Sequence, residues 1–235
     1  MPGQNRFEEM IHKLLTVDEE TWGMYAFSRE LLNKRISSVK REVMIYRAME
    51  CGKEYAQRIM KECGTRDVRA IARILKTEVV CQKTSMAGKR ILFACYTPPD
   101  KIEIMTEPVS QAVRLISKAD SNLVELFRQD GIMDTILGHE VFHRLEDEYC
   151  KEIYTRTEKI LLWNFMGFKN YSTIRALGEI GAMAFTKELN GLSYSPFLLD
   201  ILLYYGYDSS GAEKMYREVL GMSSGRCRET VENFK

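Results

Sequence analysis

Five consecutive residues, His139-Glu140-Val141-Phe142-His143, form an H-E-x-x-H pattern, and they use two of the three histidines in the chain. A helix turns by about 100° per residue, so side chains four residues apart lie on one face, a turn apart. Two imidazoles at that spacing can bind one metal ion. Zn²⁺ held there lowers the pKa of a bound water to about 7, and a neighbouring carboxylate can accept the proton. The pattern therefore predicts a zinc site with Glu140 as general base.

The residues around this pattern predict a helix that presents the two histidines to a cleft. Asp130-Gly131 is a turn signal, with Asp130 as a candidate N-cap. Leu137, Val141 and Leu145 recur at intervals of four and give an apolar stripe, which should pack on the rest of the protein. The histidines belong to a different row. We expect helix to continue to about Phe165, with Gly167 marking the turn after it.

A catalytic zinc site normally has three protein ligands and an open position, so the two histidines need a third partner. His12 is the remaining histidine, and its amphipathic N-terminal segment predicts an ordinary helix-face residue. Glu146 follows the pattern on the same helix, but about 10 Å of axial rise separates it from His139. Three ligands from one straight helix would be strained, so a carboxylate from a second helix is the better candidate.

A second helix is predicted from Ile174 to Leu189, because Asn190-Gly191 after it is a C-cap signal. It carries Glu179 among small and apolar residues, which suit close contact with another helix. A buried carboxylate needs a partner, and a metal ion is one. Glu179 is therefore the candidate third ligand, and an ion pair with Arg175 is the alternative.

From about Asp67 to Leu189 the chain resembles the ImmA/IrrE-type metallopeptidases, within the gluzincin group of zincins. H-E-x-x-H is the specific element of this resemblance. Val68–Leu75 is similar to the family's short helix, and Thr77–Val80 to its first strand. Ile91–Tyr96 and Lys101–Met105 are similar to its hairpin. Glu179-x-x-Ala182-x-x-Phe185 is similar to its third-ligand helix. The resemblance implies that His139, His143 and Glu179 bind Zn²⁺ and that Glu140 is the catalytic base.

The chain also departs from the family. Phe142 stands where the family's usual H-E-L-G-H has a small residue, so the packing beneath the helix must differ. About 65 mainly helical residues precede the similar region. A predicted helix from Ile116 to Arg128 lies between the strands and the zinc helix. These differences from the family concern which substrate the protein binds and how it is regulated more than whether it binds a metal ion.

Composition restricts the classes of protein that fit. A chain of 235 residues with 45% hydrophobic residues can bury a sizeable core, and its net charge of +1 argues against a dedicated nucleic-acid surface. The six cysteines contain no C-x-x-C, and the N-terminus is polar, which predicts reduced thiols in a cytoplasmic protein. The most apolar segment, Pro196–Tyr205, is too short to span a membrane and contains Asp200.

These patterns predict an α+β fold that is predominantly helical. Residues 1–64 would form a helical N-terminal extension, and residues 65–235 a zincin-like metallopeptidase domain with a small, mostly antiparallel sheet and C-terminal helices. We expect a long helix from about Asp18 to Cys63, with Gly52 as its candidate break. In zincins the edge strand of the sheet commonly holds extended substrate, and the resemblance makes Lys101–Met105 the candidate strand.

The expected activity is hydrolysis of peptide bonds in a protein or peptide substrate, with Glu140 returning its proton to the leaving amine. Tyr171, Arg175 and the Tyr204-Tyr205 pair are candidate donors to the oxyanion. Two alternatives remain open. One is a zinc-binding regulator with a zincin fold and no proteolytic activity. The other is a helical interaction module in which the H-E-x-x-H pattern is coincidental.

Overall fold

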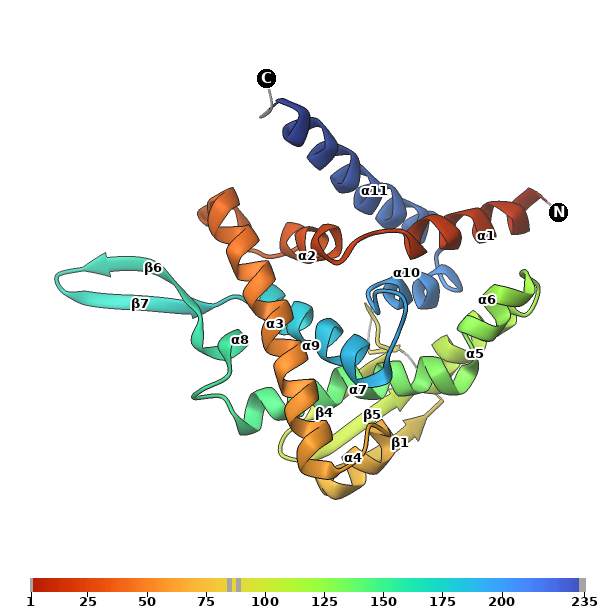
Figure 1. Ribbon diagram of the computed structural model, residues 1–235, viewed down its shortest axis with the longest axis horizontal. Coiled ribbons are helices and arrows are strands. Elements are labelled where there is room, and N and C mark those ends of the chain that lie inside the picture. Colours follow the sequence, from red (N-terminus) through yellow and green to blue (C-terminus); the bar gives the residue numbers. More distant parts are fainter. Residues whose placement is uncertain (1, 84–85, 88–89, 233–235) are drawn as a thin grey trace.

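The computed structural model describes residues 2–83, 86–87 and 90–232, and the chain is α+β and predominantly helical, as predicted. In this described part, helices surround three short sheets (Figure 1). The helices are α1 (Pro2–Leu15), α2 (Glu19–Ser28), α3 (Ser38–Cys63), α4 (Val68–Ile74), α5 (Thr106–Ile116), α6 (Ser121–Leu126), α7 (Gln129–Glu148), α8 (Tyr154–Thr157), α9 (Arg175–Asn190), α10 (Leu198–Tyr205) and α11 (Ser209–Glu232). The strands are β1 (Glu78–Gln82), β2 (Met86–Ala87), β3 (Arg90–Ile91), β4 (Ala94–Thr97), β5 (Lys101–Met105), β6 (Lys159–Phe165) and β7 (Phe168–Thr173).

The largest sheet has the strand order β1-β5-β4, with β5 parallel to β1 and antiparallel to β4. The prediction that Lys101–Met105 is an edge strand is wrong, because β5 is hydrogen-bonded on both sides. Its alternating Ile102 and Ile104 are buried, which is what a central strand packed on one face requires. The edge beside the cavity described below belongs to β4.

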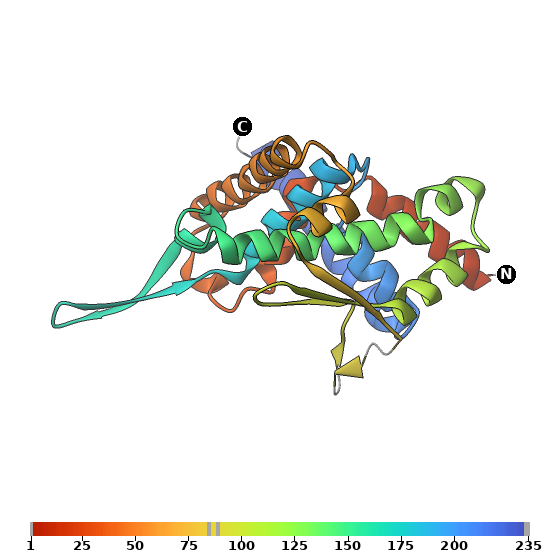
Figure 2. The same ribbon diagram turned by 90° about the horizontal axis from the view of Figure 1, so that it is seen from below.

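Helix α7 lies between this sheet and helix α9, and α3 packs along α9 on the outer side (Figures 1 and 2). The apolar stripe predicted on α7 is confirmed, because Leu137, Val141 and Leu145 are all buried. Gly138 is the point where α7 and α9 approach closely, since a Cβ added there would lie 3.1 Å from the Thr186 side chain. The helix that carries both histidines is therefore covered on two sides.

The long helix predicted from Asp18 to Cys63 is wrong. Helix α2 ends at Ser28, a 3-10 turn follows, and α3 begins after Ser37, whose hydroxyl accepts a hydrogen bond from the Lys40 amide. Gly52 does not break α3. It faces α9, where its missing side chain lets the two helices approach each other.

We expect Gly52→Ala to lower the free energy of unfolding by about 1–3 kcal/mol, although alanine favours helices. The new Cβ would overlap the carbonyl oxygen of Gly181 and lie 2.8 Å from the Phe185 amide nitrogen. Urea unfolding followed by circular dichroism measures the change. Gly221→Ala is the control, because a Cβ at that position on α11 meets nothing within 4 Å. Equal effects of the two substitutions would contradict the close α3–α9 contact.

Strands β6 and β7 form a hairpin that projects from the body of the molecule (Figures 1 and 2). Helix was predicted through Phe165, and this is wrong, because α7 ends at Glu148 and residues 159–165 are extended. The predicted turn at Gly167 is confirmed. Met166 and Gly167 both have positive φ, which is typical of a two-residue hairpin turn. Phe165 and Phe168 flank it with 67% and 74% of their surfaces exposed.

Buried side chains from α1 to α11 belong to one hydrophobic core, so the N-terminal helices pack together with the rest of the chain. Cys51, Cys63, Cys81, Cys95 and Cys150 are free thiols, and the side chain of Cys227 lies outside the described residues. Among the described helices, none is both long enough and apolar enough to cross a membrane.

Candidate metal centre

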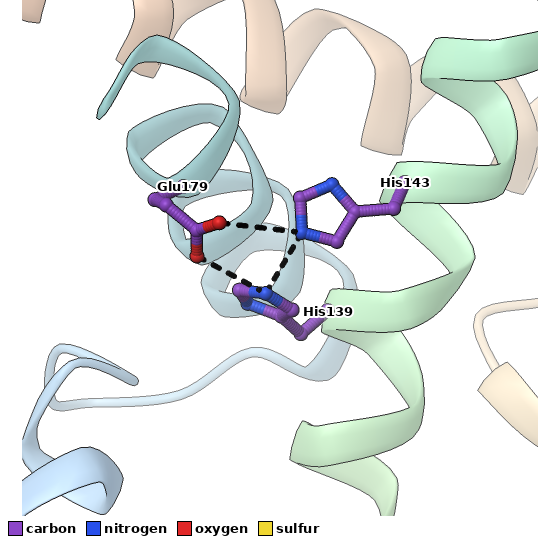
Figure 3. A group of neighbouring side chains, drawn as sticks. All are labelled: His139, His143 and Glu179. Atoms are coloured by element: carbon purple, nitrogen blue, oxygen red, sulfur yellow. Dashed lines mark hydrogen bonds and ion pairs between the residues drawn. The ribbon is translucent and has the colours of Figure 1, made fainter. Parts of the chain in front are cut away.

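His139 and His143 project from consecutive turns of α7 toward Glu179 on α9 (Figure 3). Their two Nε2 atoms lie 2.9 Å apart. One carboxylate oxygen of Glu179 lies 3.4 Å from Nε2 of His139, and the other lies 3.8 Å from Nε2 of His143. The structure thus brings the three predicted ligands together, and Glu179 pairs with the histidines instead of Arg175.

The dimensions of this group fit a small tetrahedral ion. Zinc bonds to nitrogen and oxygen are about 2.0–2.2 Å long, so neighbouring ligand atoms in a tetrahedron are about 3.3 Å apart. The three distances here lie on either side of that value, and the ligand atoms are all within 4.8 Å of one another. Two imidazoles and a carboxylate are also a donor set that catalytic zinc accepts.

Phe142 explains how α9 comes close enough to deliver Glu179. Its ring is fully buried and packs against Phe185 of α9 with the ring centroids 5.4 Å apart. Gly181 supplies the space, because a Cβ there would come within 2.8 Å of the Phe142 ring. The packing difference expected from Phe142 is therefore met by a glycine on the facing helix, two residues after Glu179.

The group is strongly polarised without a metal ion. Burial lowers the pKa of His139, but the hydrogen bond with Glu179 and its negative charge outweigh burial and raise this pKa to about 9. Half of the Glu179 side chain is exposed, so the full burial expected from the sequence is wrong. Loss of part of its hydration raises the pKa of Glu179, but the hydrogen bond with His139 and the attraction of both histidines lower it to about 2. At neutral pH His139 is therefore a cation and Glu179 an anion.

We expect zinc binding at pH 7 to release a proton from His139. A ligating imidazole must be neutral, whereas the metal-free His139, with a pKa of about 9, is protonated at this pH. Glu179 is already ionised and releases none. Apparent zinc affinity should then rise about tenfold per pH unit up to about pH 9. Calorimetric titration in two buffers of different ionisation enthalpy measures the released protons, and a value of zero would contradict the His139–Glu179 ion pair.

Glu146 holds the ring of His143 from behind. Its carboxylate lies 2.8 Å from Nδ1 of His143, the nitrogen that faces away from the cluster. The same carboxylate, which is almost fully buried, accepts a 2.5 Å hydrogen bond from Thr155 and pairs with Arg156 at 3.3 Å. Gly178 of α9 makes room for it. Glu146 therefore orients His143 and does not belong to the group that could hold a metal ion, in a relation that is common for metal-binding histidines.

His139 is held differently. Its Nδ1 is buried and has no hydrogen-bond partner among the described residues. The orientation of this ring is therefore set by packing and by Glu179, whereas that of His143 is also fixed by Glu146.

The cluster lies on the wall of a cavity of about 580 Å³. Glu140 lines this cavity with only 8% of its surface exposed. Edge strand β4 contributes Ala94, Cys95 and Tyr96 to the wall. An extended chain lying in the cavity would thus pass between a free strand edge and the H-E-x-x-H helix.

None of the donors proposed from the sequence lines the main cavity. Tyr171 is on the projecting hairpin with half of its surface exposed, and Arg175 lines a smaller neighbouring cavity that shares His143 and Glu179. The main cavity instead contains Tyr96 and Arg156, which sequence reasoning missed. No pattern around either residue indicates a site, because each reaches the cavity only through the tertiary fold.

The two tyrosines of α10 are also outside the main cavity. The Tyr204 hydroxyl donates a hydrogen bond to Asp208, and the Tyr205 ring packs against Phe7. His12, as expected, is away from the cluster, on α1, where it pairs with Asp120 at 2.8 Å.

Comparisons of the chain with models of protein families, with curated proteins and with solved structures found no match. The chemistry of the cluster and its cavity is therefore the basis for interpreting the protein.

Proposed function

We propose that the protein is a zinc-dependent metallopeptidase with a zincin-like fold, similar to the ImmA/IrrE type. The observation that carries this proposal is the convergence of His139, His143 and Glu179 on the wall of a cavity that also contains Glu140. A metal-binding helix packed beside a small sheet with a free edge strand supports it. The resemblance noted from the sequence assigns the same four residues.

The donor set supports zinc as the resident metal, which when bound would act as a Lewis acid toward the scissile carbonyl and the attacking water. Glu140 follows the first ligand on the same helix and lines the same cavity, which supports it as the group that would take a proton from that water. It would then give the proton to the leaving amine. Its shielded position keeps bulk water from competing for the proton.

The protein substrate would bind along β4. The outer edge of this strand carries backbone groups that β5 does not use, and an extended peptide can pair with such an edge. Arg156 lines the cavity and its guanidinium has five N–H donors, so it is the donor that we propose for the negative charge on the carbonyl oxygen. The Tyr96 hydroxyl already donates a hydrogen bond to the carbonyl oxygen of Pro99.

Metal content tests the proposal directly. We expect about one zinc per chain in the wild-type protein purified without added metal, measured by inductively coupled plasma mass spectrometry. His139→Ala and Glu179→Ala should both lose it, because two remaining ligands are too few for a stable site. His12→Ala is the matched control and should keep its zinc.

The other outcomes separate the alternatives. If His139→Ala loses zinc and Glu179→Ala keeps it, the protein has a metal site but Glu179 is not one of its ligands. Stoichiometric zinc without Glu140-dependent cleavage would favour the non-proteolytic regulator. No zinc in the wild type, and none taken up on titration, would contradict the peptidase.

A further inference from the structure

Asp200 is the only charged residue of α10, a helix whose other residues are leucine, isoleucine and tyrosine. The leucines and the isoleucine of this helix are buried, and Asp200 lines the main cavity together with His139 and Glu179. An acid in the first turn of a helix gains some stabilisation from the helix dipole. The sequence already showed this acid as the interruption of the most apolar segment.

The carboxyl group of Asp200 has no cation or donor in direct contact in the part of the chain that the structure describes, and only longer-range attraction by His139 and Arg29 acts on it. It takes part in no hydrogen bond and no ion pair there, although acids in such surroundings normally have one. Burial raises its pKa to about 6, attraction by His139 and Arg29 opposes this shift, and repulsion by Glu179 adds to it. The protein thus keeps an acid where ionisation is unfavourable, and this acid faces the space that a ligand would occupy.

The charges on the cavity wall are mainly negative. Four acids line it, Glu140, Asp147, Glu179 and Asp200. The positive groups are Arg156, which already pairs with Glu146, and His139, which is cationic without metal and would be neutral as a zinc ligand. The proposed function uses two of the four acids, one as base and one as metal ligand. The charges of Glu140 and Glu179 would offset the two positive charges of a bound zinc ion, so Asp147 and Asp200 are the acids that remain for the substrate.

The wall beside Asp200 is apolar, with Met183, Pro196, Leu199 and Leu203 among its residues. A carboxylate within an apolar lining suits a long side chain with a methylene stem and a cationic end. A neutral side chain of the same length would fill the space but leave the carboxylate without a partner. The cavity should therefore discriminate strongly between cationic and neutral side chains.

We propose that this cavity binds a lysine or arginine side chain of the substrate, and that Asp200 is the residue that recognises its charge. The inference rests on the proposed peptidase function for the identity of the substrate as a peptide. It concerns binding, however, and can be tested without turnover.

The probe is a library of acetylated and amidated hexapeptides in which one position holds lysine, arginine or norleucine. Norleucine keeps the stem of lysine and removes its charge. The peptides are passed over immobilised Glu140→Gln protein with one equivalent of zinc, and mass spectrometry identifies the retained ones. We expect cationic peptides to be retained about tenfold or more over their norleucine counterparts at one position.

Adding Asp200→Asn to this protein should abolish the preference, because asparagine has nearly the same shape and no charge. Adding Glu125→Gln instead should preserve it. Glu125 is an acid on α6 with 80% of its side chain exposed, and it does not line the cavity. The zinc content and the melting temperature of each variant are measured to check that its metal site and its fold are intact.

Equal retention of lysine and norleucine peptides, retention of neither, or a preference that survives Asp200→Asn would each overturn the inference. The first two outcomes do not depend on whether the Asp200→Asn protein folds. Incubating wild-type protein with the same library tests the proposed function separately. Absence of cleavage there would count against the peptidase, while cleavage without a cationic preference would overturn only the role of Asp200.

Discussion

Glu140→Gln is expected to lower the rate of peptide cleavage by about 10²–10⁴-fold while the protein keeps its fold and its zinc. Glutamine preserves the size of the side chain but cannot accept a proton. Glu140 makes no ion pair among the described residues and is not one of the three clustered ligands, so its loss should leave the metal site unchanged. The decrease of intact hexapeptides from the library, followed by mass spectrometry, gives the rate, and metal analysis gives the zinc content.

Glu148→Gln is the control for this result. Glu148 lies on the same helix, pairs with Arg144 at 2.7 Å and does not line the cavity. This variant should cleave at the wild-type rate. If Glu140→Gln also kept that rate, Glu140 would not be the base, and if both variants lost activity, the effect would come from the helix as a whole.

The geometry of the two histidines could be predicted because it is local. Helical periodicity alone places side chains four residues apart on one face, whatever the rest of the chain does. Glu179 was predicted from its unusual apolar and small neighbours, and two of these neighbours have defined roles. Gly181 accommodates Phe142, and Gly178 accommodates Glu146. The small residues thus indicated a close helix contact before its partner was known.

The sheet order and the hairpin could not be predicted in the same way. Segment 101–105 was expected at an edge, because the sequence does not show that β1 pairs with its second side. The run from Lys159 to Phe165 contains leucine, tryptophan and phenylalanine, which fit a helix or a strand. The turn at Met166-Gly167 and the pairing with β7 decide for the strand.

The wall of the cavity was the least predictable part. Arg156 and Tyr96 reach it from segments about 60 residues apart, and Asp200 reaches it from a third segment. Each contribution depends on how distant elements pack, and a single sequence carries no record of that packing.

Glu146→Ala is expected to have two large effects. Zinc affinity should fall about 10–100-fold, because the ring of His143 would lose the carboxylate that orients it. The free energy of unfolding of the metal-free protein should fall by about 1–3 kcal/mol, because the buried Thr155 hydroxyl loses its acceptor while the half-exposed Arg156 can turn to water. Chelator competition measures the affinity, and urea unfolding measures the stability.

Glu146→Gln separates orientation from structure. Glutamine keeps the volume between α7 and α9 and can still accept a hydrogen bond from Nδ1 of His143, but it has no negative charge to strengthen that bond. If Glu146 acts on the metal through His143, zinc affinity should be highest with glutamate, lower with glutamine and lowest with alanine at this position. The affinity of the glutamine variant should be lower even if this variant unfolds at nearly the wild-type urea concentration. Unchanged zinc affinity in an unstable alanine variant would instead assign Glu146 to the fold alone. The stepwise result would show that the metal site extends beyond its three ligands, to a carboxylate that the sequence places on the same helix but whose role depends on the packing of α9.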